Sequence, residues 1–277
     1  MKSKRLAQGI ALHAAMGIVV VICVFPVLWS CVISVKSVGE KVSGFSALAI
    51  QNPTLANYAR LFQLVPIGQQ LGNSVFTAVV GTVTTLFFCA LAGFAFAKYQ
   101  FPYRDALFYF VVATMTIPAE VGAVPLFLIM KEVGLINSLW SLILPGLTPA
   151  FGVFMMRQFA SNGVPTETME AARIEGASET HILFRIAFPM LAPGIFSLAI
   201  LTFMNTWNDF LWPIIIMNRK ENLTVTAMLR SIGDVSMNGG YGILLAAVTL
   251  SALPILVMYM AFNKQLVKGI VEGSGKE

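Results

Sequence analysis

Long apolar stretches alternate with short polar connections along the whole chain. No Asp, Glu, Lys or Arg occurs in residues 6–35, 61–97, 133–156 or 235–263, and residues 106–130 and 186–218 contain one acid each. Every stretch exceeds the roughly 20 apolar residues that a helix needs to cross the hydrocarbon core of a bilayer. The pattern predicts six membrane-spanning helices, near residues 10–35, 69–97, 106–130, 138–158, 191–217 and 240–263.

The composition supports a membrane protein. The 277 residues are 57% hydrophobic and 11% charged, and the mean hydropathy is +0.79. Soluble domains carry about 25% charged residues. The basic start "MKSKR" resembles a secretory signal, but the apolar run after it is about twice the usual length and lacks a small-residue cleavage site. We therefore expect an uncleaved first helix and one all-α transmembrane domain over residues 1–277.

Lys and Arg in the connections predict the orientation, because they are enriched on the cytoplasmic side. With the N-terminus inside, the inside connections contain eleven: Lys2, Lys4, Arg5, Lys98, Arg104, Arg157, Arg173, Arg185, Lys264, Lys268 and Lys276. The outside connections contain seven: Lys36, Lys41, Arg60, Lys131, Arg219, Lys220 and Arg230. This bias, with an even number of spans, predicts an inner-membrane protein with both termini and the polar loop 159–190 in the cytoplasm.

The remaining composition favours no site chemistry. Cys23, Cys31 and Cys89 lie in apolar runs without a CxxC or Cys/His cluster, so we expect free buried thiols that act as small hydrophobic residues and no metal site. The pI of about 9.2 fits basic loops beside anionic lipid and requires no nucleic-acid partner.

The loop 159–190 has the pattern of two short helices joined by a corner. Pro165 suits the first turn of a helix, and Glu170 lies near the positive end of its dipole. Gly176 is suited to end that helix, and Ser178 to cap the next one. Pro189 ends the second helix. The physical pattern alone leaves two interpretations open, an ordinary interfacial helix-turn-helix or a docking element for another protein.

The residue spacing resembles the EAA loop of binding-protein-dependent ABC importer permeases. That pattern is EAA, three residues, G, nine residues, I, one residue and LP, and every spacing occurs here from Glu170 to Pro189. Glu175 stands where sugar permeases usually have Asp, and Phe188 where they usually have Leu. Further segments are similar to the carbohydrate permeases and to the tail of the second, six-span permease of maltose-type systems: "NSVFTAVVGTVTTLFFCALAGFAFAKYQFPYRD", "IPAEVGAVPLFLIMKEVGLINSLWSLILPGL", "NTWNDFLWP" and "KQLVKGIVEGSGKE".

This resemblance implies a type I importer permease fold and a coupling function for the loop. The residues implied to dock on a cytoplasmic ATPase subunit are Glu170, Ala171, Ala172, Glu175, Gly176, His181 and Arg185. The tail 264–277 is implied to make a second ATPase contact through Lys268, Gly269 and Gly273, with a disordered basic tail as the alternative. The chain has no GxxxxGK[ST] loop, so we expect no catalytic residue and no bound cofactor here, and ATP and Mg on the partner ATPases.

Polar groups inside apolar stretches are costly and mark candidate pathways. Asp209 lies among Asn205, Trp207 and Asn208, groups that hydrogen-bond and stack on sugars. It fits a translocation path equally well as it fits a backbone or partner contact. For Glu120, between two prolines, we favour an interfacial position slightly over a pathway position.

The outside loop 218–239 is predicted to meet an external substrate-binding protein. Asn222, Arg230 and Asp234 are candidate contacts by position, with a solvated loop as the alternative.

The sequence thus predicts one permease of an ATP-driven importer for a sugar, oligosaccharide or polyol. Its expected partners are a second permease in a heterodimer, two ATPase subunits, a binding protein and membrane lipid. An ion-coupled carrier using Glu120 and Asp209 is the alternative, and it leaves the EAA spacing unexplained. A membrane-embedded enzyme has no visible nucleophile, metal or cofactor constellation.

Overall fold

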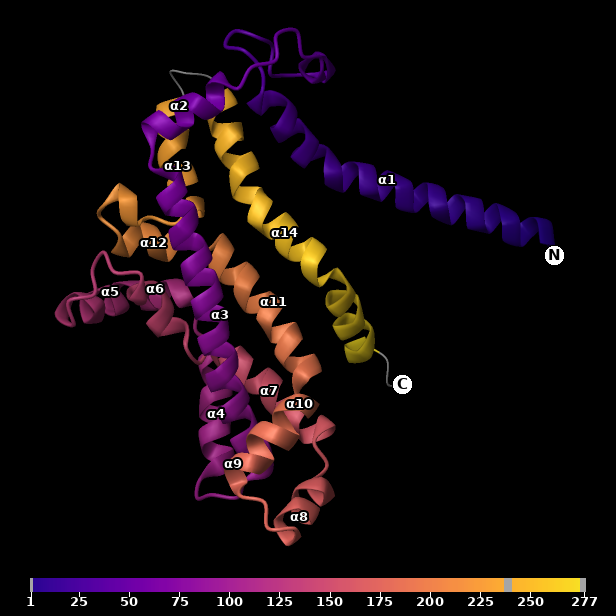
Figure 1. Ribbon diagram of the computed structural model, residues 1–277, viewed down its shortest axis with the longest axis vertical. Coiled ribbons are helices and arrows are strands. Elements are labelled where there is room, and N and C mark those ends of the chain that lie inside the picture. Colours follow the sequence, from indigo (N-terminus) through magenta and orange to yellow (C-terminus); the bar gives the residue numbers. More distant parts are fainter. Residues whose placement is uncertain (1, 237–240, 275–277) are drawn as a thin grey trace. The chain divides into compact units, whose positions relative to one another are not determined.

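The computed structural model describes residues 2–236 and 241–274, with side chains for 9–44, 47–230, 232 and 241–260 (Figure 1). The described residues fold into helices joined by loops, which confirms the all-α prediction. The α-helices are α1 (Lys2–Ser34), α2 (Ala56–Leu64), α3 (Ile67–Lys98), α4 (Arg104–Thr114), α5 (Ala123–Glu132), α6 (Trp140–Ile143), α7 (Ala150–Gly163), α8 (Thr166–Ile174), α9 (Glu179–His181), α10 (Phe188–Met190), α11 (Ala192–Asn208), α12 (Leu211–Ile216), α13 (Val225–Ser236) and α14 (Tyr241–Ser274). Short 3₁₀ helices cover Phe45–Leu48, Ala119–Gly122, Leu144–Gly146 and Lys220–Asn222, and a π-helix covers Ile182–Ala187.

The predicted spans differ in regularity. Among the described residues, three helices are long and apolar enough to cross a membrane: Gly9–Ser34, Ile67–Lys98 and Tyr241–Met260. Two further candidates are bent pairs, Arg104–Thr114 with Ala119–Glu132 at 93°, and Glu179–Met190 with Ala192–Asn208 at 72°. The candidate spans therefore include both continuous helices and helices that are broken by a sharp bend.

The predicted span near residues 138–158 is not one continuous helix. This stretch is divided into α6, the 3₁₀ turn Leu144–Gly146 and α7, and α7 has only 14 residues. Pro145 and Pro149 explain the division, since proline lacks the N–H that a helix interior needs and clashes with the preceding turn. Apolarity alone did not reveal these breaks.

The chain divides into two compact units. Unit 1 comprises residues 1–68 and 228–256, and unit 2 comprises residues 69–227 and 257–277. In unit 1 the amide of Asn57 on α2 is buried and donates to the backbone oxygens of Ser34 (3.0 Å) and Lys36 (2.8 Å). Gly242 leaves room for this amide, because a Cβ there would lie 2.5 Å from Asn57 Nδ2. The loop after α1 is thus fixed by hydrogen bonds.

Helix α1 exposes most of its large apolar side chains, including Val21 and Ile22, at 66% and 65%. Cys23 is also exposed there, Cys31 is half-buried and Cys89 is buried, so burial of all three thiols was wrong. These surfaces are compatible with lipid, where apolar side chains face the acyl chains.

Unit 2 is built along α3. At the N-terminal end of this helix, the Gln70 and Asn73 amides donate to Lys220 O (2.8 Å) and Glu221 O (2.8 Å). In the middle of the helix, Thr85 Oγ1 donates to Gly146 O (2.7 Å). Helices α8 and α9 lie towards its C-terminal end (Figure 1). Helix α3 thus links two loop regions that are far apart in space.

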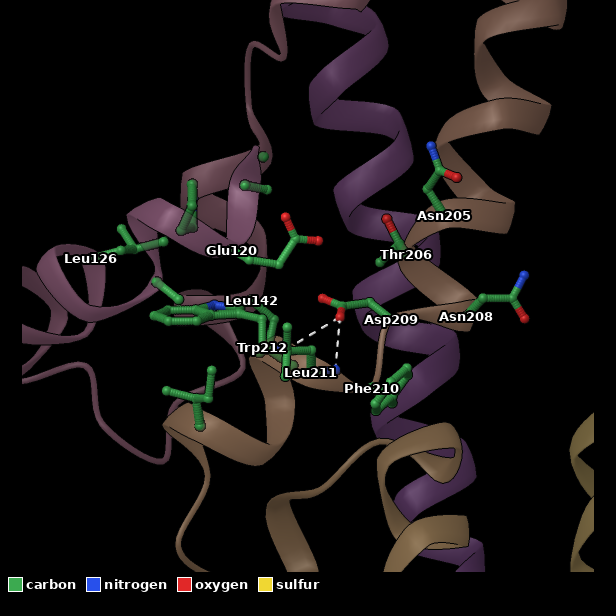
Figure 2. Close-up of a pocket in the computed structure, with 15 residues that line it drawn as sticks. Glu120, Leu126, Leu142, Asn205, Thr206, Asn208, Asp209, Phe210, Leu211 and Trp212 are labelled. Atoms are coloured by element: carbon green, nitrogen blue, oxygen red, sulfur yellow. Dashed lines mark hydrogen bonds between the residues drawn. The ribbon is translucent and has the colours of Figure 1, made fainter. Parts of the chain in front are cut away.

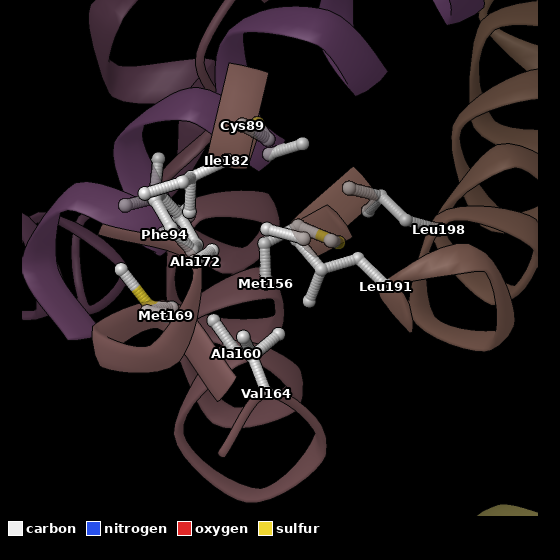
Figure 3. Close-up of a cluster of buried hydrophobic side chains, with 13 residues drawn as sticks. Cys89, Phe94, Met156, Ala160, Val164, Met169, Ala172, Ile182, Leu191 and Leu198 are labelled. Carbon is white, nitrogen blue, oxygen red and sulfur yellow. The ribbon is translucent and has the colours of Figure 1, made fainter. Parts of the chain in front are cut away.

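The C-terminal half of α3 packs tightly on α7. A Cβ at Gly93 would lie 2.6 Å from both Arg157 N and Met156 Cβ, so only glycine permits this backbone approach. The surrounding buried cluster joins α3, α7, α8, the π-helix and α11 (Figure 3). It contains Cys89, Ala90, Phe94, Val153, Met156, Ala160, Val164, Met169, Ala172, Ile182, Ala187, Leu191 and Leu198. This core carries the polar loop at its edge.

Candidate functional site

The polar loop forms two short helices with a sharp corner, as the sequence predicts. Gly176 has φ +84°, and its N–H donates to Arg173 O (3.0 Å) while the Ala177 N–H donates to Ala172 O (2.9 Å). These two bonds form a Schellman motif, which satisfies the last carbonyls of α8. Ser178 Oγ then accepts from the His181 N–H (3.3 Å) and caps α9.

The two faces of α8 differ sharply in solvent exposure. Met169 and Ala172 are buried in the core cluster of this chain, at 1% and 8% exposure, while Ile174 is 88% exposed. Of the predicted docking residues, Ala172 therefore packs on its own chain. The exposed ones are Glu170, Ala171, Glu175, Gly176, His181 and Arg185. We call these exposed residues, together with Ile174, the corner surface.

An exposed carboxylate next to the Gly176 corner, that of Glu179, connects three elements. Glu179 on α9 accepts from Tyr99 Oη at Oε2 (2.6 Å) and from Arg173 Nε at Oε1 (2.6 Å), and Arg173 Nη2 donates to Oε2 (3.1 Å). The Arg173 guanidinium, followed by the Tyr99 hydroxyl, holds the pKa of Glu179 at about 2. Partial burial, followed by the bond to Glu179, raises the pKa of Tyr99 to about 12. At neutral pH the carboxylate is therefore charged and the phenol is a donor.

The sequence interpretation missed this arrangement. Arg173 and Glu179 stand six residues apart across the Gly176 corner, a spacing that the Schellman motif makes close. Tyr99 is eighty residues away from Glu179 in the chain, so no local pattern could reveal its contact.

A second candidate site is a pocket of about 860 Å³ between α5, α6, α11 and α12 (Figure 2). The carboxylates of Glu120 and Asp209 point into it from opposite sides, and Asn205, Thr206 and Asn208 line it from α11. Asp209 Oδ1 accepts from the N–H groups of Leu211 (3.1 Å) and Trp212 (3.3 Å), so it also caps α12. The predicted backbone contact of Asp209 is thus present, and Asp209 also lines the pocket, while its place on a translocation path stays a prediction.

The two other candidates of this region have different outcomes. Glu120 is exposed, lies on the 3₁₀ turn Ala119–Gly122 and lines the pocket, and its interfacial position stays a prediction. Trp207 is buried at 2% exposure and stacks on Phe203, with ring centroids 5.8 Å apart, and does not line this pocket. The indole that does line it belongs to Trp212, whose Nε1 donates to Ser141 O (2.9 Å). The aromatic and acidic pattern located the region but not the correct tryptophan.

The loop after α12 is held in place by hydrogen bonds with Asn137. Asn137 Oδ1 accepts from the N–H groups of Asn218 (2.6 Å) and Arg219 (3.1 Å), and Asn222 Nδ2 donates to Asn137 O (2.7 Å). Asn222 is thus engaged within the chain, whereas Arg230 on α13 is exposed. The predicted contacts Asp234, Lys268, Gly269 and Gly273 lie on helical backbone, outside the residues with described side chains.

The comparisons with known proteins agree with the motifs. Residues 89–271 match the model of the binding-protein-dependent transport system inner membrane component family. The chain belongs to this family. It is therefore a membrane component of a transport system with partner subunits, and not an enzyme.

The relatives include permeases of sugar transport systems. The arabinooligosaccharides transport system permease protein AraQ of Halalkalibacterium halodurans is 35% identical over 205 residues, which cover 74% of this chain and 73% of that protein. The lactose transport system permease protein LacG of Rhizobium radiobacter is 28% identical and covers 97% of both chains. A bacterial ABC transporter involved in the import of the acidic polysaccharide alginate contains a chain of the same fold, with a TM-score of 0.81 and 23% identity over 95% of this chain and 98% of that one.

Proposed function

We propose that this chain is one of two permease subunits of an ATP-driven importer of a sugar, oligosaccharide or related polyol. The observation that carries the proposal is the exposed corner surface, which presents Glu170 and Ile174 on a rigid Schellman corner with the complete EAA spacing. The relatives AraQ and LacG, which are permeases of arabinooligosaccharide and lactose transport systems, support a carbohydrate as the substrate. Family membership disfavours the ion-coupled carrier.

In this proposal the corner surface docks on a cytoplasmic ATPase subunit. Ile174 enters an apolar recess and Glu170 meets a cation beside it, since a large exposed apolar side chain ringed by polar groups is typical of an interface. Two ATPase subunits bind ATP and Mg, and the chain itself binds neither. Closure of the ATPase dimer moves the permeases between inward-facing and outward-facing states as a rigid-body change.

The proposed assembly has further contacts. A second permease completes a heterodimer in the inner membrane, and both termini of this chain lie in the cytoplasm. The tail 264–277 gives a second ATPase contact. The loop 218–239, with Arg230 exposed, faces an external substrate-binding protein. The pocket between Glu120 and Asp209 opens to the sugar path, where amides and carboxylates provide hydrogen-bond partners for hydroxyl groups.

The test is Glu170→Lys in the complete complex reconstituted with its binding protein. We expect the variant to insert and assemble with the second permease, while sugar uptake driven by ATP is abolished, because a cation replaces the docking carboxylate. Glu132→Lys makes the same charge change at an exposed position on α5 and should leave uptake unaltered. Normal uptake by Glu170→Lys contradicts the docking function.

A proton ionophore distinguishes the rival mechanism. Uptake that persists with ATP held constant supports the ATP-driven importer. Uptake that collapses at once under the same conditions supports the ion-coupled carrier with Glu120 and Asp209.

A further inference from the structure

Three elements of the ATPase-facing half of unit 2 meet at a single carboxylate. Arg173 occupies the last turn of α8, Glu179 begins α9, and Tyr99 directly follows α3. The Glu179 carboxylate accepts three hydrogen bonds of 2.6–3.1 Å from the other two side chains. We call these three residues the corner clamp.

The corner clamp differs from the other contacts that hold the loop. Met169, Ala172 and Ile182 anchor it through the buried cluster, and apolar burial is non-directional. The polar contact between Lys98 Nζ and Ser161 O is long, at 3.5 Å. Charge-assisted hydrogen bonds are shorter than neutral ones. Arg173 donates one to each oxygen of the Glu179 carboxylate, and such a paired contact fixes the orientation of the two groups. The core therefore resists separation of the loop from α3, while the clamp fixes the angle between them.

The location of the clamp matters because α8 and α3 have different tasks in the proposed function. Helix α8 carries the corner surface, and α3 is one of the straight helices long enough to cross the membrane. If α8 rotates by sliding over the apolar core, α3 does not turn with it. If the rotation is transmitted through the hydrogen bond between Glu179 and Tyr99, α3 turns together with α8.

We propose that the corner clamp is a positioning device that makes the α8–α9 corner and the adjacent end of α3 turn as one body. Resting on the proposed function, it converts movement of the ATPase subunit into movement of the span. Tyr99 is essential to this proposal, because the bonds between Arg173 and Glu179 connect only α8 with α9, whereas the Tyr99 hydroxyl connects this corner with α3.

Tyr99→Phe tests this with minimal disturbance. The substitution removes the hydroxyl and keeps the ring, which packs edge-on to Phe94 with centroids 5.6 Å apart. The bonds between Arg173 and Glu179 remain. Asp105→Asn is the control, because it removes an ion pair between neighbouring residues in the first turn of α4 (Arg104 Nε–Asp105 Oδ1, 3.0 Å). Among the described residues, its only further interaction with another helix is a weaker charge interaction with Arg157 on α7.

The measurement is the number of sugar molecules transported per ATP hydrolysed by the complete complex in proteoliposomes. We expect Tyr99→Phe to lower this ratio about threefold to tenfold, the range that corresponds to losing one ordinary hydrogen bond, because the charge of the exposed Glu179 carboxylate is screened by solvent. Assembly and the ATPase rate should stay within about twofold of the parent, as for the Asp105→Asn control, since exposed ion pairs contribute little. Glu179→Gln, which weakens both arms of the clamp, should lower the ratio at least as far.

Two results overturn the inference. An unchanged ratio in Tyr99→Phe shows that the hydroxyl transmits nothing. A loss of uptake that only parallels a loss of assembled complex shows a purely structural role. Glu170→Lys keeps these failures apart from failure of the proposed function: if that variant is uncoupled while Tyr99→Phe is normal, the clamp fails and the docking function stands.

Discussion

The contact between α3 and α7 at Gly93 offers a quantitative test of the packing. In Gly93→Ala the new Cβ would lie 2.6 Å from Arg157 N and Met156 Cβ, and 2.7 Å from Met156 C. Two of these atoms are backbone atoms, so no rotamer change relieves the contact. Because carbon atoms pack at about 3.5–4.0 Å, the two helices must separate by roughly 1 Å.

Overpacking of this kind costs about 1–3 kcal/mol. Gly81→Ala in the same helix is the control, because its Cβ would meet Thr206 Cγ2 at an ordinary 4.0 Å. The gain in helix propensity from glycine to alanine is about the same at both positions and cancels in the comparison. The expected difference between the two variants is therefore the steric cost itself.

The thiol of Cys89 reports the opening of this interface. It is fully buried, and it lies 2.7 Å from where a Cβ on Gly152 of α7 would be. In the assembled complex, with Cys23 and Cys31 changed to Ser, the rate of maleimide labelling follows the population of the opened interface. We expect Gly93→Ala to label about fivefold to a hundredfold faster than Gly81→Ala, the equivalent of about 1–3 kcal/mol. Equal rates refute the close packing of α3 on α7.

Two further predictions concern loops. The Ser37 hydroxyl, followed by the N–H groups of Gln51 and Asn52, holds the pKa of Glu40 at about 2, below its ordinary 4.5. The ionised carboxylate therefore stabilises the loop after α1 fully above pH 4.5, and this stabilisation declines as the pH falls towards 2. The protection factors of residues 36–55, which are exchange rates corrected for the intrinsic pH dependence of amide exchange, should fall over that window in the parent and stay nearly constant in Glu40→Gln; identical profiles contradict the hydrogen-bonded carboxylate. Gly176→Val should abolish uptake, because a β-branched residue at φ +84° costs about 1–3 kcal/mol and reshapes the corner, whereas Gly176→Asn tolerates this conformation and should retain most of it. Equal uptake by the two variants would show that the corner geometry is unimportant.

The features that the sequence predicted correctly are mainly local ones. Pro165 is the N-cap residue just before α8, one position earlier than predicted. Gly176 ends α8 and the Ser178 hydroxyl caps α9, so the two short helices and their corner follow from chemistry within a few residues. The exposure of Glu170 follows in the same way. The straight spans follow from apolar length, which is also a property of a continuous segment.

The features that the sequence did not predict depend on tertiary packing. In a helix that is apolar all round, periodicity does not indicate which side faces the protein, so neither the burial of Trp207 nor the approach of α7 to Gly93 was visible. Glu120 and Asp209 face one pocket because two bent segments bring them together. Tyr99 reaches Glu179 only after α3 and the polar loop have packed on the same core.

Helix α3 carries hydrogen-bonding side chains near both ends, the amides of Gln70 and Asn73 and the Tyr99 hydroxyl just beyond its last residue. Unlike a loop, the helix fixes the angle at which these two sets of side chains point relative to each other. Its 32 residues span about 48 Å, and each residue turns the helix by about 100°. An insertion of one residue between Asn73 and Tyr99 would leave both ends intact but rotate one by about a quarter turn or more relative to the other. The surface loops absorb such changes by bending. The number of residues in α3 therefore fixes the rotation of one end of the helix relative to the other.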